Sequence, residues 1–313
     1  MSSLKQALPN SISLRVYSIS CNRKQNTTSL LFSSAELSKS PQIFTEEFIA
    51  SHQTVNRNAD HDRSWFFEPQ TKETGSGSKG YLRYGTFGFA SDFVDNKTQQ
   101  KKYRREVNHV EHIPLFYQFW FPSNATSHGY VVFQSFQGRS CVGMVIEKMQ
   151  EQFANVNDGY SLRFKKLIPT DPNNGLYAGF GVKRLTLMKK NAPGDLADKY
   201  IGPSGVETVD FELSISARRK GNLGNFGALF KSLKSRAGGI LIYDGITFSE
   251  ASADIRVGNR LRKIPVFGSG SDAGVIDITD DVKTGPDGHP TFTSLVEETD
   301  ETLAELHSTL TGL

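Results

Sequence analysis

The sequence predicts an α+β fold of predominantly antiparallel sheets with packed helices, arranged in two halves. Val131, Val132 and Phe133 lie in a continuous apolar run within residues 129–136, which is typical of a strand covered on both faces. Residues 142–153 follow with apolar side chains three to four positions apart, as on one face of a helix. Residues 12–20 alternate apolar and polar side chains, as a half-buried strand does. We expect a common core that includes Phe119, Phe121, Val131, Phe133, Val145 and Met149.

Residues 1–159 are predicted to form an N-terminal α+β half, a meander of strands plus the helix just described. A loop of linker composition at residues 74–80 precedes the meander. Its strands are expected at residues 81–94, 99–110, 115–121 and 129–136, with a turn at residues 95–98. A shorter strand at residues 64–68 and a short helix that begins near Thr45 are expected before it.

Residues 160–268 are predicted to form a second, basic α+β half. Asn222 is positioned to cap a helix whose apolar face contains Phe226, Phe230 and Leu233. Residues 269–313 are predicted to be a linker followed by an acidic C-terminal helix. Strands are expected at residues 161–168, 182–188, 206–217, 239–248, 251–257, 260–267 and 275–278.

Length and composition limit the class of protein. A chain of 313 residues can bury two cores, and no run reaches the roughly 20 apolar residues of a membrane span. The first residues lack the apolar segment of a secretory signal. The two cysteines are too few for a disulfide framework or a zinc site. We therefore expect a cytoplasmic protein without membrane insertion and, because no P-loop sequence is present, without a cofactor.

Charge is distributed unevenly along the chain. Residues 1–159 contain 17 Lys/Arg against 14 Asp/Glu, residues 160–263 contain 18 against 9, and residues 264–313 contain 1 against 10. A basic body followed by an acidic tail predicts a polyanionic partner and an internal competitor for it. The alternative is that the basic residues decorate strand faces and the tail helix is simply solvated.

Basic residues in the second half are the candidates for contacts with nucleic acid. Scattered Lys and Arg suit sequence-independent binding to backbone phosphates. Residues 221–227 are glycine-rich and precede a predicted helix, so their N–H groups could also face a phosphate. The nine candidate residues are Arg218, Arg219, Lys220, Lys231, Lys234, Arg236, Arg260, Arg262 and Lys263.

A metal-dependent nuclease is the enzymatic alternative. Asp277, Asp281 and Lys283 contain an acid-x-Lys triplet after a predicted strand, where carboxylates could bind Mg²⁺ and the lysine could activate water. Arg104 and His109 have the spacing of a helical ribonuclease motif, but they lie in a predicted strand. His109 and His112 lack a third metal ligand at a suitable spacing.

Six short segments together resemble a family of uncharacterised bacterial proteins of similar length. They are Tyr84–Gly88, Pro114–Tyr117, Val132–Phe136, Ala217–Leu223, Asp277–Val282 and Asp287–Phe292. The order of the predicted elements is more loosely similar to the Rex phage-exclusion protein A and to the B protein of Kiwa antiphage systems. The resemblance implies a DNA-binding component of phage defence and assigns no catalytic residue.

The leading hypothesis is a non-enzymatic, sequence-nonspecific nucleic-acid-binding protein of bacterial antiphage defence, with DNA favoured over RNA. A companion defence protein and a homo-oligomer are the further partners considered. Two alternatives are the metal-dependent nuclease and a protein-interaction module whose acidic C-terminal helix docks on a partner.

Overall fold

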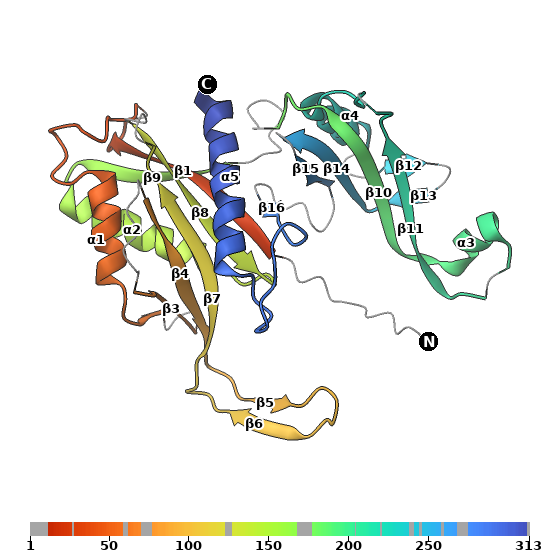
Figure 1. Ribbon diagram of the computed structural model, residues 1–313, viewed down its shortest axis with the longest axis horizontal. Helices are drawn as coiled ribbons and strands as arrows, with labels where there is room; N and C mark the ends of the chain where they lie inside the picture. The colour runs from red at the N-terminus through yellow and green to blue at the C-terminus, as the bar shows by residue number, and fades with distance from the viewer. Residues whose placement is uncertain are drawn as a thin grey trace. The chain divides into compact units, whose positions relative to one another are not determined.

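A computed structural model describes residues 12–26, 28–58, 62–69, 77–122, 127–167, 177–203, 205–219, 221–237, 241–243, 246–257, 260–267 and 275–311. The chain divides into two compact units (Figure 1). The first unit combines Met1–Lys166 with Ile278–Thr299, and the second combines Leu167–Asp277 with Asp300–Leu313. Helices and antiparallel sheets occur together, which confirms the predicted α+β class.

The first unit is built on one antiparallel sheet. In spatial order its strands are β1 (Ile12–Arg23), β8 (His128–Phe136), β7 (Glu111–Trp120), β4 (Gly77–Thr86), β3 (Arg63–Phe67) and β2 (Asn56–Asn58). β9 (Tyr160–Lys166) also pairs with β1. Val16 pairs with Val132 and Tyr117 with Phe133, which places the long apolar run of β8 at the centre of the sheet.

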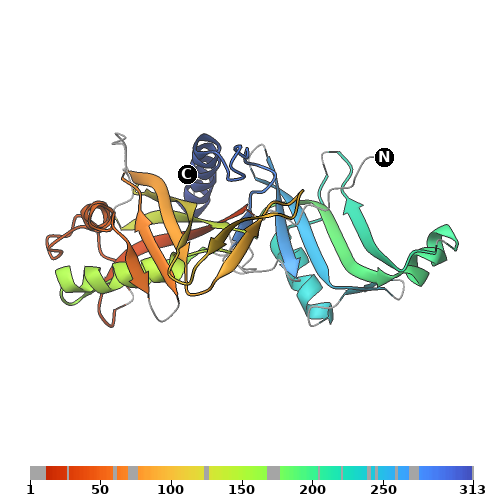
Figure 2. The same ribbon diagram turned by 90° about the horizontal axis from the view of Figure 1, so that it is seen from below.

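Helices cover both faces of this sheet. α1 (Pro41–Ser51) and α2 (Val142–Val156) contact each other through Phe44 and Phe153, whose ring centroids are 5.1 Å apart. α1 reaches the sheet through Phe48 and Phe67. α5 (Phe292–Thr311) begins on the opposite face, where Phe292 contacts Phe116 (Figure 2). All six predicted core residues are buried, so the predicted fold centre is confirmed.

A two-stranded hairpin interrupts the connection between β4 and β7. β5 (Ser91–Val94) pairs with β6 (Lys101–Arg105), and Figure 1 shows this hairpin extending from the end of the β4–β7 pair. The sequence predicted two continuous strands here. The structure instead breaks both between the Thr86–Glu111 pair and the Ser91–Arg105 pair. We call residues 88–109 the arm.

The second unit contains a four-stranded antiparallel sheet. Its order is β11 (Thr208–Ser216), β10 (Val182–Pro193), β14 (Glu250–Val257) and β15 (Arg260–Phe267). α4 (Phe226–Ala237) lies against one side of this sheet and buries Phe226, Phe230 and Leu233 (Figure 2). The remaining elements are α3 (Gly194–Ile201), β12 (Leu241–Tyr243), β13 (Ile246–Phe248) and β16 (Val275–Asp277).

The units differ from the predicted segments at two places. β9 belongs to the first unit because it forms a ladder with β1 from Tyr17–Lys166 to Arg23–Tyr160, so the division follows residue 166 rather than 159. Residues 278–299 belong to the first unit and residues 300–313 to the second, so the C-terminal region is not a separate segment. Within the described residues, no helix combines the length and apolar character needed to cross a membrane.

Candidate nucleic-acid interface

Four basic residues meet at one end of the β10–β11 pair. Arg184 is opposite Ser216 in the ladder, and the Ala217 N–H donates to the Lys183 carbonyl at 2.8 Å. The chain then turns away from the sheet at Arg218 and Arg219. We call Lys183, Arg184, Arg218 and Arg219 the basic corner. Antiparallel pairing therefore brings residues that are more than 30 positions apart in the sequence to the same end of the sheet, where Lys183 and Arg184, as consecutive strand residues, project to opposite faces.

The four cations of the basic corner differ in their partners. Arg184 Nε lies 3.2 Å from Ser216 Oγ and 3.7 Å from Asp254 Oδ2, and Lys183 Nζ donates to the Gly221 carbonyl. Arg218 and Arg219 are exposed, and their side chains form no hydrogen bond or ion pair with other described residues. Two guanidinium groups in this part of the structure are thus available to an anion from outside.

One carboxylate lies beside the basic corner. Burial raises the pKa of Asp254, while the charges of Arg184 and Lys263 act in the opposite direction. Its position next to Arg184 partly offsets that cation. The exposed guanidinium groups of Arg218 and Arg219 are therefore the main source of uncompensated positive charge at the corner.

The glycine-rich loop is a packed turn rather than an anion cradle. Five of its N–H groups donate to acceptors within the protein, beginning with Gly221 N to Arg218 O at 2.9 Å. The other bonds are Leu223 N to Val182 O at 2.8 Å, Gly224 N to Asn222 Oδ1 at 3.1 Å, Phe226 N to Phe180 O at 2.9 Å and Gly227 N to Ala178 O at 3.0 Å. Because these donors are used, the loop offers no row of N–H groups to a phosphate. Asn222 lies in this turn, and α4 begins at Phe226.

The other predicted basic residues are scattered or buried. Lys231 in α4 and Lys263 in β15 are exposed. Arg262 is 2% exposed, with Nη2 3.3 Å from Thr302 Oγ1 and 4.0 Å from Glu305 Oε2, so it does not belong to a binding surface. Lys234 and Arg236 lie in α4 and Arg260 lies in β15, whereas Lys220 is outside the described residues.

The charge asymmetry of the sequence disappears when charge is counted by unit. The first unit contains 21 Lys/Arg against 19 Asp/Glu, and the second contains 15 against 14. The acidic C-terminal region is shared between the units, and its second part lies in the same unit as the basic corner. A local cluster such as the basic corner, not the net charge of a unit, must therefore attract a polyanion.

The residues of the nuclease alternative do not form a metal site. Asp277 ends β16, whereas Asp281 and Lys283 lie before α5, and all three are exposed. Within the described part of the chain, no group of three or more His, Cys, Asp or Glu side chains is placed to bind a metal ion. Arg104 lies in β6 rather than in a helix, so Arg104 and His109 do not form the helical ribonuclease motif.

The buried titratable groups have structural roles. Burial raises the pKa of the Cys21 thiol to about 11 and raises that of Cys141 further, so neither is a reactive thiolate at neutral pH. His52 stacks between Phe48 and Trp65, with centroid distances of 4.1 Å and 5.3 Å, and its Nδ1 donates to the Phe48 carbonyl at 2.8 Å. Burial lowers the pKa of His52, which favours a neutral imidazole in this stack.

The arm is an exposed surface that the sequence reasoning did not single out. It contains five of the fourteen exposed large apolar side chains that the structure describes: Phe89, Phe93, Val94, Tyr103 and Val107. Lys97, Lys101, Lys102 and Arg104 are exposed around them. The turn predicted at residues 95–98 does not give this pair, because a regular hairpin around it would pair Phe93 with Gln100, whereas the observed ladder shifts register between Phe93 and Val94.

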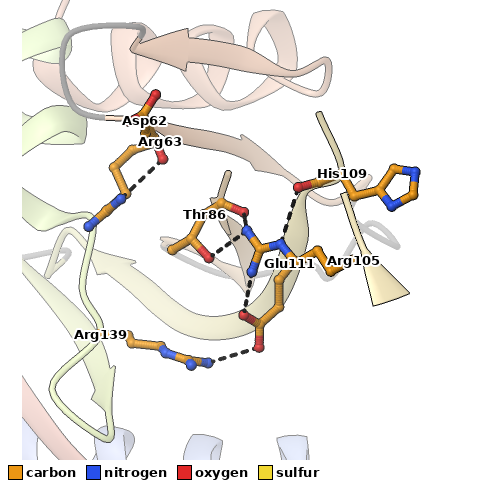
Figure 3. Close-up of polar contacts among 7 residues, drawn as sticks. All are labelled: Asp62, Arg63, Thr86, Arg105, His109, Glu111 and Arg139. Carbon is orange, nitrogen blue, oxygen red and sulfur yellow. Dashed lines mark hydrogen bonds and ion pairs between the residues drawn. The ribbon is translucent and has the colours of Figure 1, made fainter. Parts of the chain in front are cut away.

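One buried arginine fixes the base of the arm (Figure 3). Arg105 is 3% exposed and donates to Glu111 Oε2 at 3.2 Å, to the His109 carbonyl at 3.3 Å and to the Thr86 carbonyl. Glu111 also pairs with Arg139 at 3.3 Å. The Arg105 guanidinium stands 4.3 Å from the centroid of the Phe89 ring. These contacts join β6 to the last residue of β4 and the first residue of β7, which are paired with each other.

Comparisons with known proteins identify no relatives: no protein-family model matches the chain, and no curated protein is significantly similar to it.

Proposed function

We propose that the protein binds nucleic acid through its phosphate backbone without sequence preference, and that DNA is the physiological ligand. The observation that carries this proposal is the exposed pair Arg218 and Arg219, whose side chains have no partner among the described residues, at the same sheet end as Lys183 and Arg184. Guanidinium groups bind phosphate oxygens through two parallel hydrogen bonds. The basic corner thus has the chemistry of a phosphate-binding site.

The arrangement favours phosphate contacts over base readout. Arg218 and Arg219 follow the end of β11, and no helix of the kind that enters a major groove contains them. Contacts to phosphates hold a protein on nucleic acid but carry no direct sequence information. Binding through the basic corner would therefore be similar for unrelated sequences.

The biological setting is the less direct part of the proposal. We place the protein in bacterial antiphage defence, in the cytoplasm and with a companion protein as effector. This assignment rests on the similarity in element order described above. The basic corner supports binding, and a separate effector would supply any enzymatic step.

A salt titration tests the proposed function. We expect affinity for a random-sequence duplex to fall with salt, with a log–log slope of about −0.9 for each phosphate neutralised. Replacing Arg218 and Arg219 together with Ala should weaken binding and flatten the slope by about two units if each contacts one phosphate. The readout is fluorescence anisotropy at several salt concentrations, on two duplexes of unrelated sequence.

A matched control separates a local site from net charge. Lys39→Ala with Lys148→Ala removes the same two charges from residues paired with Glu47 and Glu151. This control should bind as the wild type does. The proposal fails if the wild type shows no binding at about 50 mM salt. An equal loss in the control variant would also contradict it, because net charge alone would then explain binding.

A further inference from the structure

The arm presents three aromatic rings on one face. Phe93 pairs with Tyr103 across the hairpin, and side chains of paired residues project to the same side. Their ring centroids are 6.0 Å apart with a 39° tilt, and the Tyr103 and His109 rings stack at 5.9 Å and 17°. We call Phe93, Tyr103 and His109 the aromatic row.

A hydrogen bond orders the row at its base. The Glu106 N–H donates to His109 Nδ1 at 3.1 Å, so this nitrogen is an acceptor. The Tyr103 hydroxyl, 2.5 Å from the same nitrogen, therefore donates to it. This fixes the Tyr103 ring next to His109. The row is thus organised by contacts within the arm itself.

The aromatic row is organised but not buried. Phe93 is 45% exposed and Tyr103 51% exposed, and His109 is exposed as well. Single exposed apolar side chains are normal on a protein surface, but a group gathered on one projecting hairpin marks an interaction site. The buried Arg105 holds the base of this hairpin in place, so the hairpin loses less conformational entropy when a partner binds.

Cations lie along the same hairpin, and the side chains of two of them lack partners among the described residues. Lys101 and Arg104 pair with Asp92 at 2.7 Å and 3.5 Å, and hydrogen bonding to Lys101 lowers the pKa of that carboxyl. Lys97 in the turn and Lys102 in β6 form no side-chain hydrogen bond or ion pair with the residues that the structure describes. The arm therefore combines ring faces with uncompensated positive charge.

We propose that the arm binds unpaired strands of nucleic acid, with bases stacked on Phe93 and Tyr103 and phosphates bound to Lys97 and Lys102. This inference rests on the proposed function and adds the substrate class. Ring platforms next to cations are how proteins bind single strands without reading sequence, because every base has a stacking face. Charge complementarity with phosphate favours a nucleic acid over an apolar protein partner.

The preference for an unpaired strand follows from the chemistry of stacking. In a duplex both faces of each internal base are covered by its neighbours, so a ring on a protein surface cannot reach them without unstacking. A two-stranded ribbon can also enter a major groove, where polar side chains read base edges. The Phe93 ring has no donor or acceptor for that role, and the Tyr103 hydroxyl is already bonded to His109.

The test compares a single strand that contains 2-aminopurine with the duplex of the same sequence. We expect the wild type to bind the single strand more tightly and to change the 2-aminopurine fluorescence. Phe93→Leu with Tyr103→Leu retains apolar bulk but removes both rings. It should lower single-strand affinity about tenfold or more, abolish the fluorescence change and leave duplex affinity unchanged.

Val94→Ala with Val107→Ala is the control, because these arm residues are 51% and 57% exposed but lie outside the aromatic row. It should behave as the wild type. Three results would overturn this inference and leave the proposed function standing. They are equal wild-type affinity for the single strand and the duplex, wild-type affinity of the Phe93→Leu/Tyr103→Leu variant for the single strand, or an equal loss of that affinity in the control variant. If the wild type bound neither the single strand nor the duplex, the proposed function would fail as well. If the ring variant instead lost only self-association in sedimentation, the arm would bind a second copy of the chain.

Discussion

The arm and α5 are both charged segments, and the structure uses them in opposite ways. The arm contains five Lys/Arg and three Asp/Glu, and Arg105 is its only buried side chain. α5 contains five acidic residues and no Lys or Arg, yet seven of its side chains are buried. They recur every three to four residues: Ser294, Leu295, Glu298, Thr299, Thr302, Leu303 and Leu306. The number of charged residues in a segment therefore did not predict whether that segment is exposed or buried.

Periodicity, rather than charge, separates the two segments. In α5 the Thr299 hydroxyl donates to Gln118 Oε1 at 2.7 Å, and Thr302 contacts Arg262, so hydroxyl groups extend the buried stripe between leucines. The arm has no such stripe, because a hairpin that projects from the sheet has no second layer to cover it. The buried stripe gives α5 a structural role, and competition of the acidic tail with nucleic acid for a basic surface stays a prediction.

The largest effect is expected from truncating the buried stripe of α5. Leu295 is fully buried, so Leu295→Ala should lower the free energy of unfolding by about 2–4 kcal/mol, through lost burial and a residual cavity. Glu297→Ala, at an exposed position of the same helix, should cost less than about 0.5 kcal/mol. Urea denaturation measures both.

The alternative for α5 would give a different result. If the helix were an autoinhibitory tail, Leu295→Ala would leave stability unchanged and tighten binding to a duplex. That outcome would support the competition model and remove α5 from the core of the protein.

A smaller and more local effect is expected at the base of the arm. Arg105→Ala removes charge-assisted hydrogen bonds to Glu111 and to two carbonyl groups, each worth about 1.5–3 kcal/mol to the local structure. Amide exchange should accelerate across residues 88–109 and stay unchanged in β1 and β8. Arg104→Ala, an exposed neighbour, is the control and should have little effect. Uniform acceleration across the sheet would show that the arm is not an independent element.

The sequence predicted much of the first unit because its signals are local. The apolar run of β8 and the helical spacing of Val145 and Met149 needed no knowledge of distant contacts. The sequence did not predict the break between β4 and β5. Arg105 stabilises this break because its side chain contacts both Thr86 of β4 and Glu111 of β7. No pattern within β6 marks Arg105 as buried, because the other four residues of the strand are exposed.

The candidate site was predicted less well, for a related reason. Arg262 is paired with Ile255 and lies two positions before Ile264 in β15, so the alternation of that strand directs it to the buried side. A count of basic residues cannot detect this. Lys183 and Arg184 join Arg218 and Arg219 only because β10 and β11 pair, and long-range pairing is not visible in a local pattern.

The most direct test of the account is photochemical cross-linking of the wild-type protein to a partly single-stranded DNA, followed by peptide mapping. We expect cross-links at Phe93 or Tyr103 within residues 88–109 and at the basic corner, and none in α5. Cross-links confined to α5, or the absence of any cross-link at both predicted surfaces despite measurable binding, would contradict it.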